Sequence, residues 1–354
     1  SLLFDAGLLN ASSFLLNYTG TLTSSQLGAT VNFTNIENIF DENGSNQYVL
    51  ASGDWSGVSG QLTAGNLGKY KAQFSTDSST NALVVTFSKN GYVWDGTYES
   101  SVWNDTDFSA EEGVSKYNEN SNLVFSDSAE NTSSIKLTGS STIDNIFFDN
   151  SDKEYTISSD NGSSITANAI TQSGSGESSI AAKTIVKTVE VSGGRLNLQN
   201  ADLNGGHLKV QNGALSLGIS SNETIPYLHL LDGARLELSA TNARRLEVSN
   251  ATRKEVNTTM ELVALGKGTI YDYKSKYTVN EGGVLSIGDA ELSNNWNTIL
   301  GSIELMNSAS LNVEAGNLAV VNGITLKEGH STISISDDAI VACAPTSKIT
   351  TASG

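Results

Sequence analysis

Short runs in which apolar and polar residues alternate cover most of the chain, and clusters of Gly, Asn, Asp and Ser separate them. Such alternation predicts strands that bury one face, and the clusters predict tight turns between the strands. Long windows with apolar residues at helical spacing do not occur in the sequence. The pattern therefore predicts an all-β protein.

A unit of about 20 residues repeats in the second half of the chain. Gly193, Gly213 and Gly233 lie 20 residues apart, and each sits in a turn between two apolar runs. A coiled parallel sheet requires such a repeat, because each coil adds one strand to each face. The copies are residues 191–198, 210–217, 230–238, 279–287, 305–313 and 326–333.

A β-sandwich also contains short alternating strands, but its strands and loops would not recur at a fixed spacing. We therefore predict a right-handed parallel β-helix, a solenoid whose inward positions stack as ladders of Val, Leu and Ile. An irregular β-rich N-terminal segment precedes it. If the coils cover residues 115–340, a step of about 4.8 Å gives about 11 coils and a rod of about 50 Å.

The repeat also suggests the division of the chain. Residues 1–90 lack the 20-residue period and could form a cap, a small sandwich or irregular coils. Residues 91–340 are predicted to form the β-helix, with an inserted irregular coil at about 239–278, where the rhythm breaks. Residues 341–354 are predicted to be a C-terminal tail.

The net charge of the chain limits the classes of molecule that it can bind. The 354 residues include 20 Lys and Arg against 38 Asp and Glu, a formal net charge of -18. Nucleic acid is a poor partner for such a chain, because phosphate binding needs clustered cations. The charge also disfavours anionic lipid, and no stretch has the roughly 18–20 apolar residues of a membrane span. We expect neither nucleic-acid binding nor membrane contact by this segment.

Two tryptophan-containing motifs open the predicted coil. Residues 92–98 read YVWDGTY, residues 101–104 read SVWN, and stacked strands follow up to residue 166. This arrangement resembles the passenger-associated transport repeat of autotransporter passenger domains. The resemblance implies a secreted, surface-displayed right-handed β-helix, exported by a C-terminal outer-membrane barrel. That barrel would lie outside this sequence, since residues 350–354 show no membrane strand.

Catalytic chemistry has little support in the sequence. Ser/His/Asp catalysis needs a positioned imidazole, and His207, His229 and His330 all lie in or beside repeat strands. No nucleophile elbow or phosphate loop is present. We therefore expect no enzymatic activity.

Clustered acids raise the question of calcium, the one cofactor that the sequence suggests. Most acidic clusters in so acidic a chain are expected to be solvated surface. One group follows the tryptophan pair and could bind Ca²⁺ through its carboxylates. Its members are Asp105, Asp107, Glu111 and Glu112.

A basic band interrupts the acidic chain where the repeat breaks. Residues 235–276 carry 5 acids and 8 bases, a local net charge of +3. Arg side chains suit carboxylate or sulfate groups, and tyrosines stack on sugar faces. We predict that this band contacts acidic glycans; alternatively, its bases neutralise neighbouring acids. The candidate residues are Arg235, Arg244, Arg245, Arg253, Lys254, Tyr271, Tyr273 and Tyr277.

These patterns favour a secreted, surface-displayed β-helical passenger domain that acts as an adhesin or structural shaft and contacts host or environmental glycans. Self-association between like rods, as in cell aggregation, is the main alternative. A carbohydrate-active β-helix enzyme is a third possibility, and three or more carboxylates converging on adjacent coils would indicate it.

Overall fold

Two compact units make up the chain, and the boundary between them falls between Tyr92 and Val93. The first unit is β-rich, and the second is a long solenoid. A computed structural model describes residues 2–9, 16–21, 30–40, 45–55, 59, 62–65, 67, 70–89, 91–94, 102–103, 108–109, 121–129, 134–327, 329–344 and 349–351.

The N-terminal unit contains two small sheets. Strands β1, β3 and β5 form a parallel sheet, and β2, β4, β7 and β6 form a second sheet in which β7 is antiparallel to both neighbours. Phe33 lies in the shared core, with its ring centroid 6.2 Å from Phe74 and 5.0 Å from Phe87. The unit therefore has two sheets on one core. Its elements are β1 (Leu2–Asp5), η1 (Ala6–Leu8), β2 (Leu16–Thr21), β3 (Thr30–Thr34), η3 (Ile36–Asn38), β4 (Gln47–Asp54), β5 (Thr63–Ala64), β6 (Tyr70–Asp77) and β7 (Ala82–Lys89).

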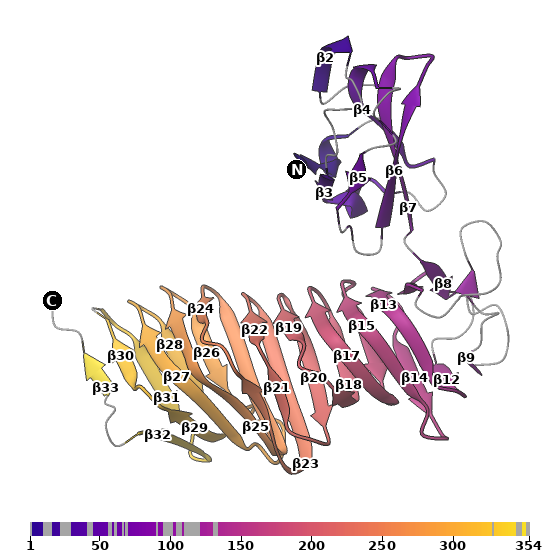
Figure 1. Cartoon of the computed structure of the whole chain (residues 1–354). Coiled ribbons are helices and arrows are strands. Elements are labelled where there is room, and N and C mark those ends of the chain that lie inside the picture. The colour runs from indigo at the N-terminus through magenta and orange to yellow at the C-terminus, as the bar shows by residue number, and fades with distance from the viewer. Residues whose placement is uncertain are drawn as a thin grey trace. The chain divides into compact units, whose positions relative to one another are not determined.

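The second unit is a parallel β-solenoid of about ten turns, which confirms the predicted fold class (Figure 1). Its first part contains β8 (Tyr92–Trp94), β9 (Val102–Trp103), β10 (Phe108–Ser109), β11 (Leu123–Ser126), β12 (Ser134–Leu137), β13 (Ser141–Asp149), β14 (Tyr155–Ser159), β15 (Ser164–Gln172), β16 (Glu177–Ile180), β17 (Lys183–Val191) and β18 (Arg195–Asp202). The central part contains β19 (His207–Val210), β20 (Gly213–Ile219), β21 (Glu223–Ile225), β22 (Tyr227–Leu230), β23 (Ala234–Val248), β24 (Arg253–Val256) and β25 (Thr259–Val279). The last part contains β26 (Val284–Ile287), β27 (Asn297–Leu305), β28 (Ser310–Val313), β29 (Gly316–Val320), β30 (Ile324–Leu326), β31 (Thr332–Ile335), β32 (Ala339–Cys343) and β33 (Ile349–Thr351).

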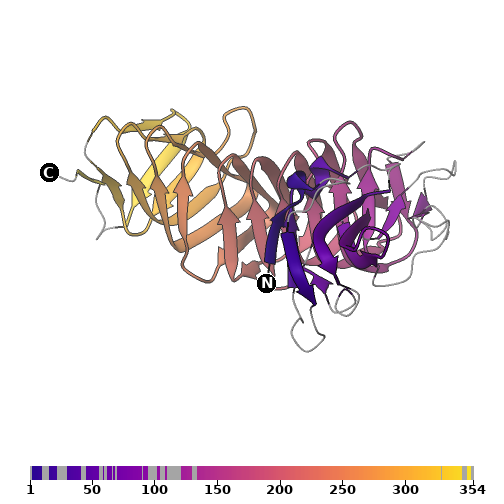
Figure 2. The ribbon, with the colours of Figure 1, turned by 90° about the horizontal axis from the view of Figure 1, so that it is seen from above.

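Three parallel sheets run along the solenoid. Figure 2 shows the coils stacked one after another from β13 toward the C-terminus. The first sheet contains β12, β14, β16, β18, β20, the starts of β23 and β25, then β26, β28 and β31. The second contains the starts of β13, β15 and β17, the end of β18, β21, the end of β23, the middle of β25, the start of β27, then β29 and β32. The third contains β11, the ends of β13, β15 and β17, then β19, β22, β24, the ends of β25 and β27, β30 and β33.

The core of the solenoid consists of ladders in which one coil stacks on the next. Leu215 lies in register with Leu196 on one side and with Leu236 on the other, and all three are fully buried. At the start of the solenoid, Trp94 and Trp103 are also buried and pack against Phe125, at centroid distances of 6.3 and 5.9 Å. The tryptophan pair therefore fills the core at the start of the solenoid.

The length of the coils varies, and this explains the break in the sequence rhythm. The register advances by 19 residues from Leu196 to Leu215 and by 26 from Leu236 to Leu262. Segment 239–278, predicted to be an inserted irregular coil, consists of β23, β24 and β25 with short turns at 249–252 and 257–258. Its strand β25 pairs in parallel with β27 of the next coil. The registers shift only between Ala240 and Arg244 and between Asp272 and Lys276. The rhythm breaks because the coils become longer while the strands stay in the sheets.

The coils stack so closely that some glycines leave no room for a side chain. A Cβ atom on Gly206 would lie 1.5 Å from the backbone oxygen of Lys187 in the preceding coil. We expect Gly206→Ala to lower the free energy of unfolding by about 1–3 kcal/mol, because backbone must move to admit the methyl group. Gly139→Ala is the matched control, since no atom lies within 4 Å of its Cβ position. Urea denaturation of both variants checks the prediction, and an equal effect of the two substitutions would contradict it.

Candidate functional site

The predicted basic band lies on β23, β24 and β25, but its members have three different environments. Arg235 is held in a carboxylate network on the first sheet. Lys254 and Tyr277 are buried inside the solenoid. The remaining residues lie on the outer surface of the second and third sheets.

Three carboxylates surround the Arg235 guanidinium. Its Nε is 2.7 Å from Glu237, and its two Nη atoms are each 2.5 Å from an acid, one from Glu261 and one from Asp289. Arg195 also donates to Glu237, which is itself buried. Arg235 thus neutralises its neighbours, and its donors are occupied. For Arg235 the structure therefore agrees with the alternative prediction, in which the bases of this band neutralise neighbouring acids rather than bind a glycan.

The network shifts the pKa values of its members. Burial acts to raise the pKa of the Glu237 carboxyl, but the hydrogen bonds from Arg235 and Arg195 outweigh it and hold the pKa below its usual value. The hydrogen bond from Arg235 likewise lowers the pKa of Asp289. These carboxylates are therefore charged in the folded protein over a wider pH range than free side chains.

Lys254 and Tyr277 meet at a buried aspartate. The ammonium of Lys254 is 2.6 Å from Oδ2 of Asp272, and the Tyr277 hydroxyl donates to the same oxygen at 2.8 Å. Ser275 donates to Oδ1 of Asp272 at 2.5 Å. Lys254 is 3% exposed, and Asp272 and Tyr277 are 0% exposed. The prediction that Lys254 and Tyr277 contact a surface ligand is wrong, because both side chains point into the solenoid.

Burial dominates the electrostatics of this cluster. It lowers the pKa of the Lys254 ammonium, and the nearby Asp272 charge acts in the opposite direction. Burial raises the pKa of the Tyr277 hydroxyl, and the Asp272 charge adds to that effect. The cluster joins two consecutive coils, since Lys254 lies in register with Tyr277.

The outer surface carries a patch of two tyrosines flanked by cations. The rings of Tyr271 and Tyr273 are 4.7 Å apart between centroids, and both are half-buried. Arg245 lies 5.5 Å from the Tyr271 ring centroid, and Lys274 lies 5.3 Å from that of Tyr273. We call these four residues the tyrosine patch. Cations at such distances from ring faces are attracted to them, so the patch is held in place by its own contacts.

Two further arginines lie outside the tyrosine patch. Arg244 precedes Arg245 on β23, and its Nε donates to the backbone oxygen of Ser220 at 2.9 Å. Arg253 lies exposed on β24 in the third sheet and pairs with Glu255 at 3.2 Å. Within the patch, Arg245 also pairs with Glu247 at 2.9 Å. The structure thus brings together Arg245, Tyr271 and Tyr273 from the predicted set, and it adds Lys274. Arg244 and Arg253 have other partners.

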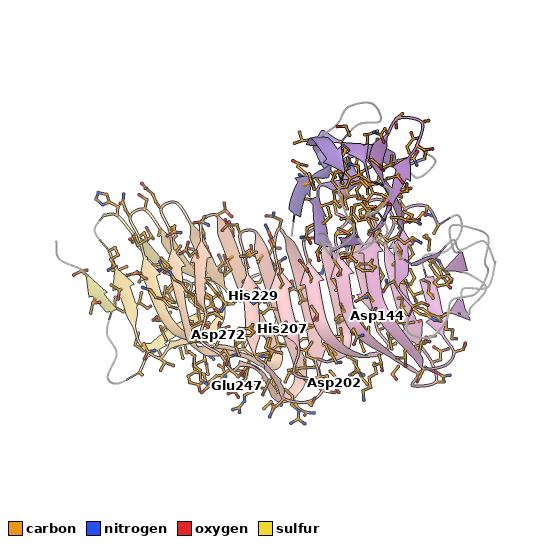
Figure 3. All side chains as sticks on the ribbon, turned by 45° about the horizontal axis from the view of Figure 1, so that its top comes forward. Asp144, Asp202, His207, His229, Glu247 and Asp272 are labelled. Atoms are coloured by element: carbon orange, nitrogen blue, oxygen red, sulfur yellow. The ribbon has the colours of Figure 1, made fainter. Side chains whose placement is uncertain are left out.

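His207 and His229 lie on either side of an exposed tyrosine, Tyr227, on the surface of the third sheet. His207 stacks on Tyr227 of the next coil at 5.7 Å, and His229 lies 5.8 Å from Tyr227 on the same strand (Figure 3 labels both histidines). His207 and Tyr227 lie in register on the third sheet. His207 and Tyr227 are 20 residues apart, which is the length of one coil in this region. That spacing is the signal from which the pair could have been predicted.

The proposed calcium ligands Asp105, Asp107, Glu111 and Glu112 lie outside the described residues. In the part of the chain that the structure describes, no three His, Cys, Asp or Glu side chains are grouped so as to hold a metal ion. The same part of the chain has no helix with the length and apolar character of a membrane span.

Comparison with protein-family models, curated proteins and solved structures gives no match for this chain. The resemblance to autotransporter passenger domains therefore stays a prediction based on the tryptophan motifs and the strand repeat.

Proposed function

We propose that the chain is a secreted, surface-displayed β-solenoid shaft that contacts acidic glycans through the tyrosine patch. The observation that carries the proposal is the pairing of the Tyr271 and Tyr273 rings beside Arg245 and Lys274. Adjacent half-exposed rings offer stacking area to a sugar, and the cations attract a carboxylate or sulfate group.

Local charge supports an acidic ligand. The patch carries two cations, Arg245 and Lys274, and Arg245 is also paired with Glu247. The chain as a whole is strongly acidic, with a net charge of -18. An anionic glycan would therefore be repelled over most of the surface and attracted here, with a dependence on ionic strength.

Glycan binding by wild-type and variant protein tests the proposal. We expect 3′-sialyllactose to bind more tightly than lactose, and we expect Tyr271→Ala combined with Tyr273→Ala to weaken binding by about tenfold or more, because two stacking contacts are lost. Isothermal titration calorimetry at low salt measures both. Tyr227→Ala is the matched control, since Tyr227 is an exposed tyrosine on another sheet. Equal binding by wild type and the double variant would refute the site.

A further inference from the structure

A second candidate site lies at the corner where the first sheet passes into the second. A groove with a volume of about 660 Å³ follows this corner. It is lined by residues of successive coils, from Gln199 and Asn200 at one end to Asn294 at the other. It therefore runs lengthwise along the solenoid.

Strand register shows that the groove is continuous from coil to coil. Gly218 pairs with Ser239 of the next coil, and Ala240 pairs with Gly266 of the coil after that. The backbone nitrogen of Gly266 then donates to the oxygen of Asn294 at 2.8 Å. Each step along the groove is thus one inter-strand step of about 4.8 Å.

Small residues form the floor of the groove because the backbone of the preceding coil lies too close for a side chain. A Cβ atom on Gly218 would lie 2.1 Å from the backbone oxygen of Gln199. Gly266 has a φ of +64°, and a Cβ there would lie 2.5 Å from the oxygen of Ala240. Larger side chains are excluded at both positions, so the hollow is a fixed part of the fold.

The lining combines apolar surface with amide and hydroxyl groups and is nearly neutral. Amides of Gln199, Asn200 and Asn294 and the hydroxyls of Ser220 and Thr241 face the groove, and Lys267 is the one charged residue in its lining. Amides and hydroxyls can both donate and accept hydrogen bonds, as the hydroxyl groups of sugars do. A polyanion would need more cations than this groove offers.

We infer that this corner groove binds a neutral, extended β-1,4-linked glycan lengthwise, with about one sugar residue per coil. The length of one pyranose in an extended β-1,4 chain is close to the step of about 4.8 Å between coils, so a straight chain places about one sugar beside each coil. Alternate sugars are turned over, and each hydrogen-bonds to the amides and hydroxyls that its own coil offers. An α-1,4-linked chain coils and has a shorter rise per sugar, so its sugars do not match the spacing between successive coils. The site is distinct from the tyrosine patch and does not rest on the function proposed for it.

Isothermal titration calorimetry measures binding to the groove. We expect cellohexaose to bind about tenfold or more tightly than cellobiose, since the hexaose spans every coil of the groove. Maltohexaose should bind no better than cellobiose. Absence of binding heat with cellohexaose, or equal affinity for the two hexaoses, would overturn the inference.

Variants separate this site from the tyrosine patch. Thr241→Arg fills the groove from an exposed position and should abolish cellohexaose binding, whereas Thr156→Arg, at an exposed strand position elsewhere, should leave it unchanged. Tyr271→Ala with Tyr273→Ala should also leave it unchanged. Circular dichroism confirms folding of each variant. Unchanged cellohexaose binding by a folded Thr241→Arg variant would refute the groove, whatever the outcome for 3′-sialyllactose.

Discussion

Replacing Lys254 by methionine is expected to lower the free energy of unfolding by about 3–5 kcal/mol. The substitution keeps the volume of the side chain but removes the ammonium that lies 2.6 Å from Asp272. Asp272 is fully buried, so its carboxylate would keep only hydroxyl donors, Tyr277 and Ser275. A buried charge without an opposite charge is strongly destabilising. Urea denaturation followed by circular dichroism measures the loss.

Two further variants make this prediction specific. Lys274→Met removes an exposed cation of the same strand region and should change the free energy of unfolding by only about 0.5 kcal/mol. Combining Lys254→Met with Asp272→Leu should recover part of the loss, because it removes both buried charges. The explanation fails if the single Lys254 variant is as stable as wild type, or if the double variant is the least stable of the three.

The burial of Lys254 could have been predicted from its strand. In the sequence Arg253, Lys254, Glu255, Val256, alternation places Lys254 on the same side as Val256, which belongs to the core. A count of bases within a segment does not reveal this burial, because it carries no information on which side of the strand each base lies. Strand parity carries that information.

The burial of Tyr277 had no comparable signal. Tyr271 and Tyr273 point outward, and continued alternation would place Tyr277 outward as well. The register shifts between Asp272 and Lys276, where the strand turns the corner into the third sheet, and the parity of the side chains changes there. A shift of one residue moves every later side chain to the opposite face, and no turn residue marks it in the sequence.

The fold was predictable because its signals are periodic. Alternation within strands and glycines at 20-residue spacing repeat many times, so a few residues that break the pattern do not change the predicted fold. Contacts across coils depend instead on the length of each coil. Arg235 meets Glu261 and Asp289, which are 26 and 54 residues away, and the sequence does not specify those distances.

Replacing Arg235 by methionine is expected to lower the free energy of unfolding by about 2–4 kcal/mol near pH 7, somewhat less than for Lys254 because Arg235 is partly exposed. Its guanidinium bonds Glu237, Glu261 and Asp289 at 2.5–2.7 Å, and Glu237 is buried. Without it, three carboxylates lie close together, and only Arg195 remains beside Glu237. Arg253→Met is the control: Arg253 is exposed and pairs only weakly, so its loss should cost less than about 1 kcal/mol.

The pH dependence of this difference provides the sharper measurement. The folded protein holds the pKa values of Glu237 and Asp289 below their usual values through the hydrogen bonds from Arg235. A carboxyl whose pKa is lowered on folding contributes stability above its unfolded pKa, about 4, and loses that contribution as the pH falls. The stability difference between wild type and Arg235→Met should therefore be largest near pH 7 and should shrink below about pH 4. A difference of the same size at pH 7 and pH 3 would show that Arg235 stabilises the coils through packing alone, because packing does not titrate.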